Sequence, residues 1–129
     1  MPVAASLKVL VVDDQRSMRS LVRFSLNELG FTQITECEDG EEAMDVLAIH
    51  QKHLVISDLN MPKLDGLGLL RAVRSHPRLA KTAFIMLTSR GDTDLVQQAI
   101  KLGVNNYLVK PFAIDILRKK IEAVVGPLT

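Results

Sequence analysis

The stretch KVLVVDD, residues 8–14, decides the fold of this 129-residue chain. It is an apolar run without the polar alternation of a half-exposed strand, and it ends in two adjacent carboxylates, Asp13 and Asp14. A continuous run of this kind is typical of a strand that is buried on both faces, as in parallel sheets. Adjacent carboxylates at its end repel each other unless a positive charge lies between them. The stretch therefore predicts a parallel sheet with an acidic site at one edge.

The later apolar runs also end in side chains that carry chemistry. LVIS precedes Asp58, AFIML precedes Thr88 and YLV precedes Lys110. Because the carboxyl ends of parallel strands meet at the edge where ligands bind, we expect these side chains to converge with the acidic pair. Three carboxylates, a hydroxyl and an ammonium group in one place are typical of a magnesium-dependent phosphoryl-transfer site.

Strict alternation of strands and helices predicts an α/β fold with a parallel sheet. Apolar residues at helical spacing mark the helices, and Leu21 and Ile100 are among the side chains expected to face the core. Gly30 and Gly103 follow two helix ends, and Asp92 is placed to cap the fourth helix. The expected strands are 8–12, 33–37, 54–57, 82–88 and 106–109, and the expected helices are 15–29, 41–50, 67 to near 76, a segment between 92 and 103, and 113–125.

Length and composition indicate one compact domain over residues 1–129, with a core at about 8–125. Hydrophobic residues make up 47% and charged residues 24%, and the formal net charge of +1 gives no reason to expect a nucleic-acid partner. The single Cys37 excludes an internal disulfide and fits a reducing compartment. No apolar stretch approaches the roughly 20 residues that span a bilayer, and residues 1–6 lack the features of a signal peptide. We expect a cytoplasmic monomer without a membrane partner.

Four motifs carry a family resemblance: VVDD at 11–14, SDLNMPKLDG at 57–66, LTS at 87–89 and YLVKPF at 107–112. With them the chain resembles the receiver domain of two-component response regulators, most closely the single-domain, CheY-like chemotaxis type. Each motif alone is weak evidence for this family, but four motifs in this order, each at a strand end, are highly specific for it. The resemblance implies a flavodoxin-like, doubly wound (βα)5 fold whose five parallel strands lie in the order 2-1-3-4-5.

The resemblance also implies roles for the acidic residues. Asp58 is the expected phosphoacceptor, whose carboxylate attacks phosphorus to give an acyl phosphate. Asp14 and Asp58 are expected to coordinate Mg2+ directly, together with the backbone carbonyl of Asn60, while Asp13 acts mainly through water. Magnesium keeps several waters of its own, so a few protein oxygens suffice.

Two more residues of the resemblance are expected to contact the phosphoryl group. Lys110 pairs with one phosphoryl oxygen, and the hydroxyl of Thr88 donates to another. The bond between Lys110 and Pro111 resembles the cis peptide that aims this lysine in the family. The expected protein is a signalling module that catalyses only its own phosphorylation and dephosphorylation, and it is not an enzyme with a separate substrate.

Tyr107 is the expected readout residue, because chemotaxis-type receivers carry an aromatic there that swings inward when the threonine, here Thr88, moves toward the phosphoryl group. The face made by the fourth helix, the fifth strand and the fifth helix then changes its affinity for a partner. Arg90 stands where the best-known chemotaxis regulator has an acidic residue, beside the path of water to the acyl phosphate, so it is expected to modulate the hydrolysis rate. The expected basic residues of the face are Lys101, Arg118, Lys119 and Lys120.

The implied partners are a histidine kinase, of the chemotaxis type, and a flagellar motor switch protein or another output protein. No output domain is expected after Val125, so output would come from protein contact or from draining phosphate. Asn105, Asn106 and the LGLL run at 67–70 resemble receivers of alphaproteobacterial chemotaxis operons, some of which act as phosphate sinks. The residues leave motor binding and a phosphate-sink role open.

The same residues also allow structural roles and two other functions. In isolation, Asp13 and Asp14 could cap a helix, and Lys110 could be a solvated lysine. An aspartyl phosphatase of the haloacid-dehalogenase-like type also uses a carboxylate, a threonine and a lysine, but it needs Asp-x-Asp on the first strand with the nucleophile there. A flavodoxin-like cofactor binder needs a phosphate-cradling loop after the first strand, which this sequence lacks.

Overall fold

The computed structural model describes residues 3–129, and the predicted strands and helices form within two residues of their expected ends. Asp39 and Asp65 cap the second and third helices, since each side chain accepts a hydrogen bond from the backbone three residues later. In order, the elements are η1 (Ala4–Ser6), β1 (Lys8–Val12), α1 (Arg16–Glu28), β2 (Gln33–Cys37), α2 (Gly40–Ile49), β3 (Leu54–Asp58), α3 (Gly66–Ser75), β4 (Ala83–Thr88), α4 (Thr93–Lys101), β5 (Asn106–Val109) and α5 (Ile114–Val125).

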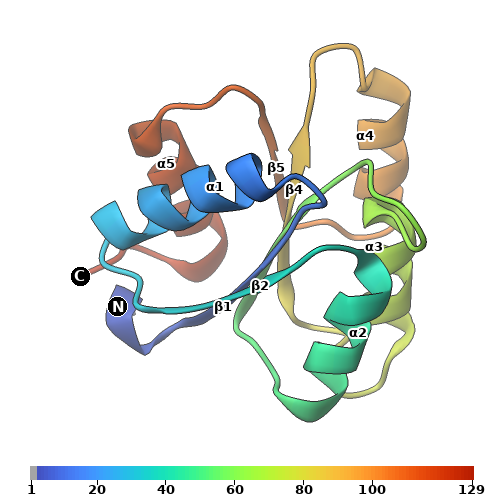
Figure 1. Ribbon diagram of the computed structural model, residues 1–129, viewed down its shortest axis with the longest axis horizontal. Coiled ribbons are helices and arrows are strands. Elements are labelled where there is room, and N and C mark those ends of the chain that lie inside the picture. Colours follow the sequence, from blue (N-terminus) through green and yellow to red (C-terminus); the bar gives the residue numbers. More distant parts are fainter. Residues whose placement is uncertain (1–2) are drawn as a thin grey trace.

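All strand pairings are parallel, and the strands lie in the order β2-β1-β3-β4-β5. This confirms the predicted flavodoxin-like, doubly wound sheet. The helices α1 and α5 cover one face of the sheet, and α2, α3 and α4 cover the other (Figure 1). Because the chain winds away from β1 in opposite directions on its two sides, the ends of β1 and β3 border the switch point where ligands bind in such folds.

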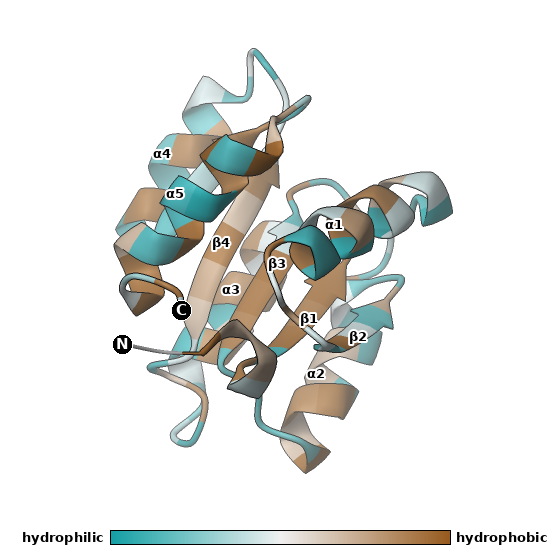
Figure 2. Ribbon diagram, turned by 90° about the vertical axis from the view of Figure 1, so that its left-hand side faces the viewer, coloured by the Kyte–Doolittle hydropathy of each residue, from teal (hydrophilic) through white to brown (hydrophobic). Residues whose placement is uncertain are grey.

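The sheet is buried on both faces, which explains why its strands are apolar without alternation. In β1, Val9 and Val11 pack toward α1 and α5, while Leu10 and Val12 pack toward α2 and α3. Each fully buried aliphatic side chain of this kind contributes about 1.5–3 kcal/mol. Figure 2 shows the result, with hydrophobic strands enclosed between helices that turn hydrophilic residues outward. Among the described residues, no helix has the length and apolar character needed to cross a membrane.

Two helical side chains expected in the core lie outside it. Leu21 on α1 is 45% exposed and Ile100 on α4 is 50% exposed. Successive helical residues are about 100° apart, so each of these side chains lies at the margin of its buried stripe. On α1, a charged residue, Arg19, takes a buried position instead.

The predicted cap of α4 is also different in the structure. Asp92 occupies the position before the helix but its side chain makes no capping hydrogen bond. It accepts a hydrogen bond from the backbone N–H of Ser89 at 2.8 Å instead. Asp92 therefore closes the turn that follows β4 rather than the first turn of the helix.

Candidate functional site

Three carboxylates meet where β1 and β3 end. Asp13 and Asp14 follow β1, Asp58 is the last residue of β3, and one oxygen from each lies within 4.8 Å of the others. Asp13 is fully buried, Asp58 is 7% exposed, and Asp14 is open to solvent. Three negative charges this close raise one another's energy unless cations lie among them.

Lys110 supplies one cation from the loop after β5. Its Nζ lies 2.7 Å from Oδ1 of Asp58, and both side chains are largely withdrawn from solvent. The backbone N–H of Lys110 donates to the carbonyl of Thr88 at 2.7 Å, and the expected cis peptide precedes Pro111. The lysine is therefore held into the site, and the interpretation of Lys110 as a solvated surface charge is wrong.

Two buried oxygens at this edge have no hydrogen-bond partner within residues 3–129: Oδ2 of Asp13 and Oγ1 of Thr88. Buried polar atoms are almost always paired, and an unpaired one costs about 1–3 kcal/mol. Burial, opposed by the N–H of Gln15 and reinforced by Asp58, raises the pKa of Asp13 to about 6. A carboxylate oxygen and a hydroxyl left open in this way fit a hard cation and a ligand with acceptor oxygens.

The backbone around Asp13 is held from several sides. Its N–H donates to the carbonyl of Cys37 on β2 at 3.1 Å, and its Oδ1 accepts from the N–H of Gln15 at 2.9 Å. The carbonyl of Asp13 accepts from Nη1 of Arg19 at 2.7 Å. The interpretation of the acidic pair as a helix cap is therefore wrong: α1 begins after Gln15 without a side-chain cap, one oxygen of Asp13 bonds the N–H of Gln15, and the other is unpaired within the described residues.

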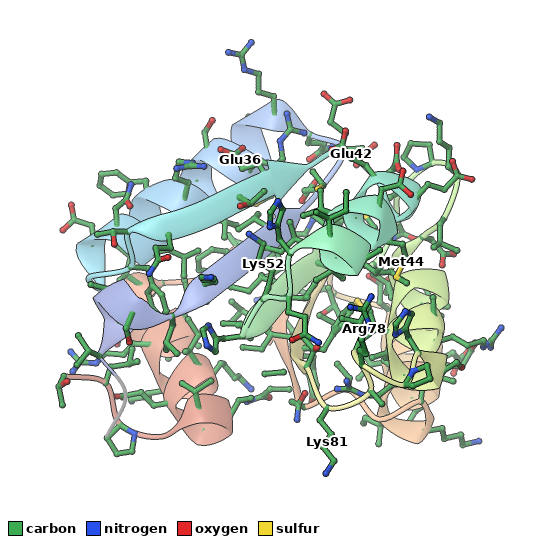
Figure 3. All side chains as sticks on the ribbon, turned by 90° about the horizontal axis from the view of Figure 1, so that it is seen from below. Glu36, Glu42, Met44, Lys52, Arg78 and Lys81 are labelled. Atoms are coloured by element: carbon green, nitrogen blue, oxygen red, sulfur yellow. The ribbon has the colours of Figure 1, made fainter. Side chains whose placement is uncertain are left out.

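Sequence reasoning missed Arg19 and its partner Glu36. Glu36 projects from β2 beside α1 (Figure 3), where it accepts hydrogen bonds from Nε of Arg19 at 3.2 Å and from Nε of Arg23 at 2.6 Å. A charged residue in an apolar helix stripe is normally assigned to solvent. The burial of Arg19 could have been predicted from two features of the sequence. Arg19 and Arg23 are four residues apart and so lie on one helix face, and the next predicted strand contains Glu36.

The loop after β3 is folded tightly against the site. The N–H of Leu59 donates to the carbonyl of Leu87 at 3.1 Å, and the N–H of Gly66 donates back to the carbonyl of Leu59 at 3.0 Å. A Cβ on Gly66 would lie 2.4 Å from the carbonyl oxygen of Asp58, so only glycine allows this approach. Asn60 is exposed on this loop, two residues after Asp58.

A hollow of about 270 Å³ lies between the end of β4, α4 and β5, and Thr88 is the residue that it shares with the site. Thr88, Arg90 and Tyr107 all line it, so the structure brings together the three residues that the sequence assigned to switching and hydrolysis. Tyr107 is half-buried, and Nζ of Lys120 lies 5.1 Å from the centre of its ring. This distance is within the range of a cation–π interaction.

Comparisons with known proteins agree with this geometry. The family model described as the response regulator receiver domain matches residues 9–122. A Rhizobium etli protein named "Probable chemotaxis protein CheY" is 52% identical over 128 residues, covering 99% of each chain. The chain belongs to the receiver domain family. The Rhizobium relative fits the predicted resemblance to alphaproteobacterial chemotaxis receivers.

Solved receivers share the fold. The chemotaxis response regulator CheY4 of Vibrio cholerae superimposes with a TM-score of 0.82 at 33% identity, over 90% of this chain and 96% of that one. The receiver domain of the sensor histidine kinase PA1611 from Pseudomonas aeruginosa, solved with a magnesium ion in its active-site cleft, gives 0.83 at 25% identity, over 93% and 98%.

This receiver is thus a phosphorylatable two-component response regulator, closely related to the CheY chemotaxis proteins. Its family implies a histidine kinase as a partner and a signalling role rather than that of a conventional enzyme. The match to receivers over residues 9–122 favours this interpretation over the haloacid-dehalogenase-like phosphatase and the flavodoxin-like cofactor binder.

Proposed function

We propose that this receiver takes a phosphoryl group from a chemotaxis histidine kinase onto Asp58 in a magnesium-dependent reaction. The observation that carries the proposal is the position of Asp58. Its carboxylate pairs with Lys110 at 2.7 Å, at an edge where Asp13 Oδ2 and Thr88 Oγ1 are buried without a partner among the described residues. A nucleophile, a cation and two open polar atoms suit an incoming phosphoryl group.

Mg2+ would be held by Asp14, Asp58 and the backbone carbonyl of Asn60, with Asp13 acting mainly through water. The close carboxylate oxygens support this assignment, since Mg2+ takes hard oxygen ligands and binds weakly where few come from protein. The magnesium ion described for the PA1611 receiver supports it as well. When bound, Mg2+ neutralises charge on the phosphoryl oxygens and so reduces the repulsion between two anions.

In the transfer itself, a carboxylate oxygen of Asp58 attacks phosphorus and forms the acyl phosphate. The P–N bond of the donor phosphohistidine breaks, and its electron pair stays on the imidazole nitrogen. The ammonium of Lys110 then pairs with a phosphoryl oxygen, and the hydroxyl of Thr88 donates to another. In this account the receiver catalyses its own phosphorylation and dephosphorylation, and no other substrate is turned over.

Output would follow from the hollow that Thr88 shares with Tyr107. Movement of the Thr88 hydroxyl toward phosphate leaves space that the Tyr107 ring can enter, which changes the face formed by α4, β5 and α5. Lys101, Arg118 and Lys119 are exposed there. A flagellar motor switch protein or another output protein would read this face, unless the receiver serves as a phosphate sink.

We propose that residues 1–129 form a single receiver domain that acts as a monomer in the cytoplasm. The buried, free thiol of Cys37 suits a reducing compartment. Arg90 lies in the exposed loop after Thr88, where its guanidinium would modulate the access of water to the acyl phosphate.

Phosphotransfer from a phosphorylated chemotaxis kinase tests the proposal. Asp58→Asn removes the nucleophile while keeping the side-chain shape, so the variant should accept no phosphoryl group. Asp45→Asn, an exposed change on α2, is the matched control and should accept phosphate at the wild-type rate. Phosphorylation of Asp58→Asn at the wild-type rate, with the label on another residue, would show that the assignment is wrong.

A further inference from the structure

The side chain of Arg19, on α1, hydrogen-bonds to the backbone of the carboxylate site. It is 8% exposed, and its Nη1 donates to the carbonyl of Asp13 at 2.7 Å. The same guanidinium donates through Nε to Oε1 of Glu36 at 3.2 Å, and its Nη2 lies 3.9 Å from Glu38. Two edges of one planar group thus connect the end of β1 to β2.

The bond to the carbonyl of Asp13 matters because that carbonyl belongs to the peptide unit that joins Asp13 to Asp14. The N–H of Asp13 is already bonded to Cys37 on β2. With its carbonyl held by Arg19, the peptide plane cannot rotate freely, so the direction in which Asp14 leaves the strand is fixed. The orientation of both carboxylates depends on this plane.

The positive charge of Arg19 is balanced by glutamates that lie outside the carboxylate site. Its ion-pair partners are Glu36 and Glu38, and within residues 3–129 its guanidinium makes no hydrogen bond or ion pair with the carboxylates of Asp13, Asp14 or Asp58. A guanidinium that bonded to those carboxylates would compete with a divalent cation. Held by Glu36, Arg19 can orient the backbone without neutralising the groups that attract Mg2+.

We propose that Arg19 is a positioning residue for the metal site. It fixes the orientation of the peptide between Asp13 and Asp14, and it is itself held in place by Glu36. The inference rests on the proposed function, because it concerns affinity for Mg2+. Groups that orient metal ligands from outside the coordination sphere typically change metal affinity about 10- to 100-fold when they are removed.

Arg23 provides a matched control because it shares Glu36 with Arg19. Its Nε lies 2.6 Å from Oε2 of Glu36, but its Nη2 donates to the carbonyl of Ile34, inside β2 and away from the carboxylates. Arg19→Lys and Arg23→Lys each keep the charge and remove one planar fork. If Arg19 acts only as a strut between α1 and β2, the two changes should affect Mg2+ binding alike.

The experiment is a Mg2+ titration of the full chain without phosphodonor. Its two readouts are the amide chemical shifts of Asp14 and its neighbours and the midpoint temperature of thermal unfolding. Wild type should bind Mg2+, Arg23→Lys should bind it within about twofold of wild type, and Arg19→Lys should bind about 10-fold more weakly. Glu36→Gln gives a second route if Arg19→Lys fails to fold: it releases the charge of Arg19 toward the site and should weaken Mg2+ binding several-fold, more at low salt.

The outcomes separate the two proposals. If wild type shows no Mg2+ response, the proposed function fails, and the inference fails with it. If wild type binds Mg2+ and a folded Arg19→Lys binds it equally well, the positioning role is overturned while the proposed function stands. Equal weakening in Arg19→Lys and Arg23→Lys would likewise overturn it, since a general strut would then account for both.

Discussion

The two edges of the sheet both contain partly or fully buried polar side chains, but these groups differ in how fully they are hydrogen-bonded. At the amino edge, the guanidinium of Arg74 on α3 donates to the carbonyls of Ala80, Thr82 and Gly103 and to the side chain of Asn105, at distances of 2.7 to 3.0 Å. At the carboxyl edge, buried oxygens of the site residues have no partner within the described part of the chain.

The contrast separates stability from function. Arg74 joins the segments that lead into β4 and β5, and the four acceptors of its hydrogen bonds are protein oxygens of the described residues. The carboxyl edge holds the unpaired oxygens of Asp13 and Thr88 beside three carboxylates. This arrangement lowers stability until a cation and a phosphoryl group supply the missing partners.

The largest expected effect is at the amino edge. Arg74→Met removes four charge-assisted hydrogen bonds and leaves backbone carbonyls unsatisfied, so the free energy of unfolding should fall by about 3 kcal/mol. The affinity for Mg2+ of the folded fraction should not change. Urea unfolding measures the first quantity and Mg2+ titration the second. Arg71→Met, an exposed change on the same helix, is the control and should alter neither. A loss of Mg2+ affinity in Arg74→Met would contradict the claim that the amino edge contributes to stability and not to metal binding.

At the carboxyl edge, Asp13→Asn should increase stability in the absence of metal. The pKa of Asp13 is raised by burial to about 6, so at pH 7 the folded state holds a carboxylate that would rather be protonated. The unfolded chain, with a pKa near 3.8, carries no such cost. The amide should therefore add about 2–3 kcal/mol to the free energy of unfolding at pH 7.

The pH dependence has a defined sign. As the pH falls through 6, the folded wild type takes up the proton, and its disadvantage relative to Asp13→Asn should shrink and vanish near pH 4. Mg2+ at neutral pH should stabilise wild type more than the variant. Urea unfolding at several pH values, with and without Mg2+, is the measurement. A constant difference between pH 4 and pH 7 would contradict the cause given for the cost.

Arg90→Glu should have a smaller effect, and on a rate. The change places a negative charge in the loop beside the phosphoryl group and alters the approach of water. We expect the autodephosphorylation rate to rise several-fold, or about 1 kcal/mol in the barrier. Decay of the phosphorylated protein at equal Mg2+ concentration measures it. Matching decay rates would leave Arg90 as a surface charge.

The smallest effect is expected for Thr88→Val in the unphosphorylated protein. Within residues 3–129 the buried hydroxyl has no partner, so an isosteric methyl group should leave the free energy of unfolding unchanged or raise it by less than about 1 kcal/mol. Phosphorylation should then fail to alter partner binding, because no hydroxyl reaches the phosphoryl group. Paired stability and pull-down measurements check both parts; a destabilised variant would mean that the hydroxyl already has a partner.

The sequence was sufficient for the sheet and for the convergence at its carboxyl edge, and physics explains why. Continuous apolar runs such as residues 8–12 require burial on both faces, and parallel strands carry their last residues to one edge. The pattern that ends in Asp13, Asp58 and Thr88 therefore predicts the position of this edge from the sequence alone.

Other features depend on tertiary contacts that periodicity does not encode. Arg19 is buried because Glu36 and the carbonyl of Asp13 lie within its reach, although its charge assigns it to solvent. Leu21 lies outside the core because the buried stripe of α1, which includes Arg19 and Val22, is rotated away from it. Asp92 bonds Ser89 rather than the helix, because the turn after Thr88 competes for its carboxylate.

The site of phosphorylation in the wild-type chain is the most direct test of Asp58 as a magnesium-dependent phosphoacceptor. Incubation with a phosphorylated chemotaxis kinase, with and without Mg2+, followed by peptide mapping of the modified residue, reads out the nucleophile and the metal requirement together. We expect a single acyl phosphate on Asp58 that forms only when Mg2+ is present. Equal labelling in the presence of a chelator, or a phosphoryl group on any residue other than Asp58, would contradict it.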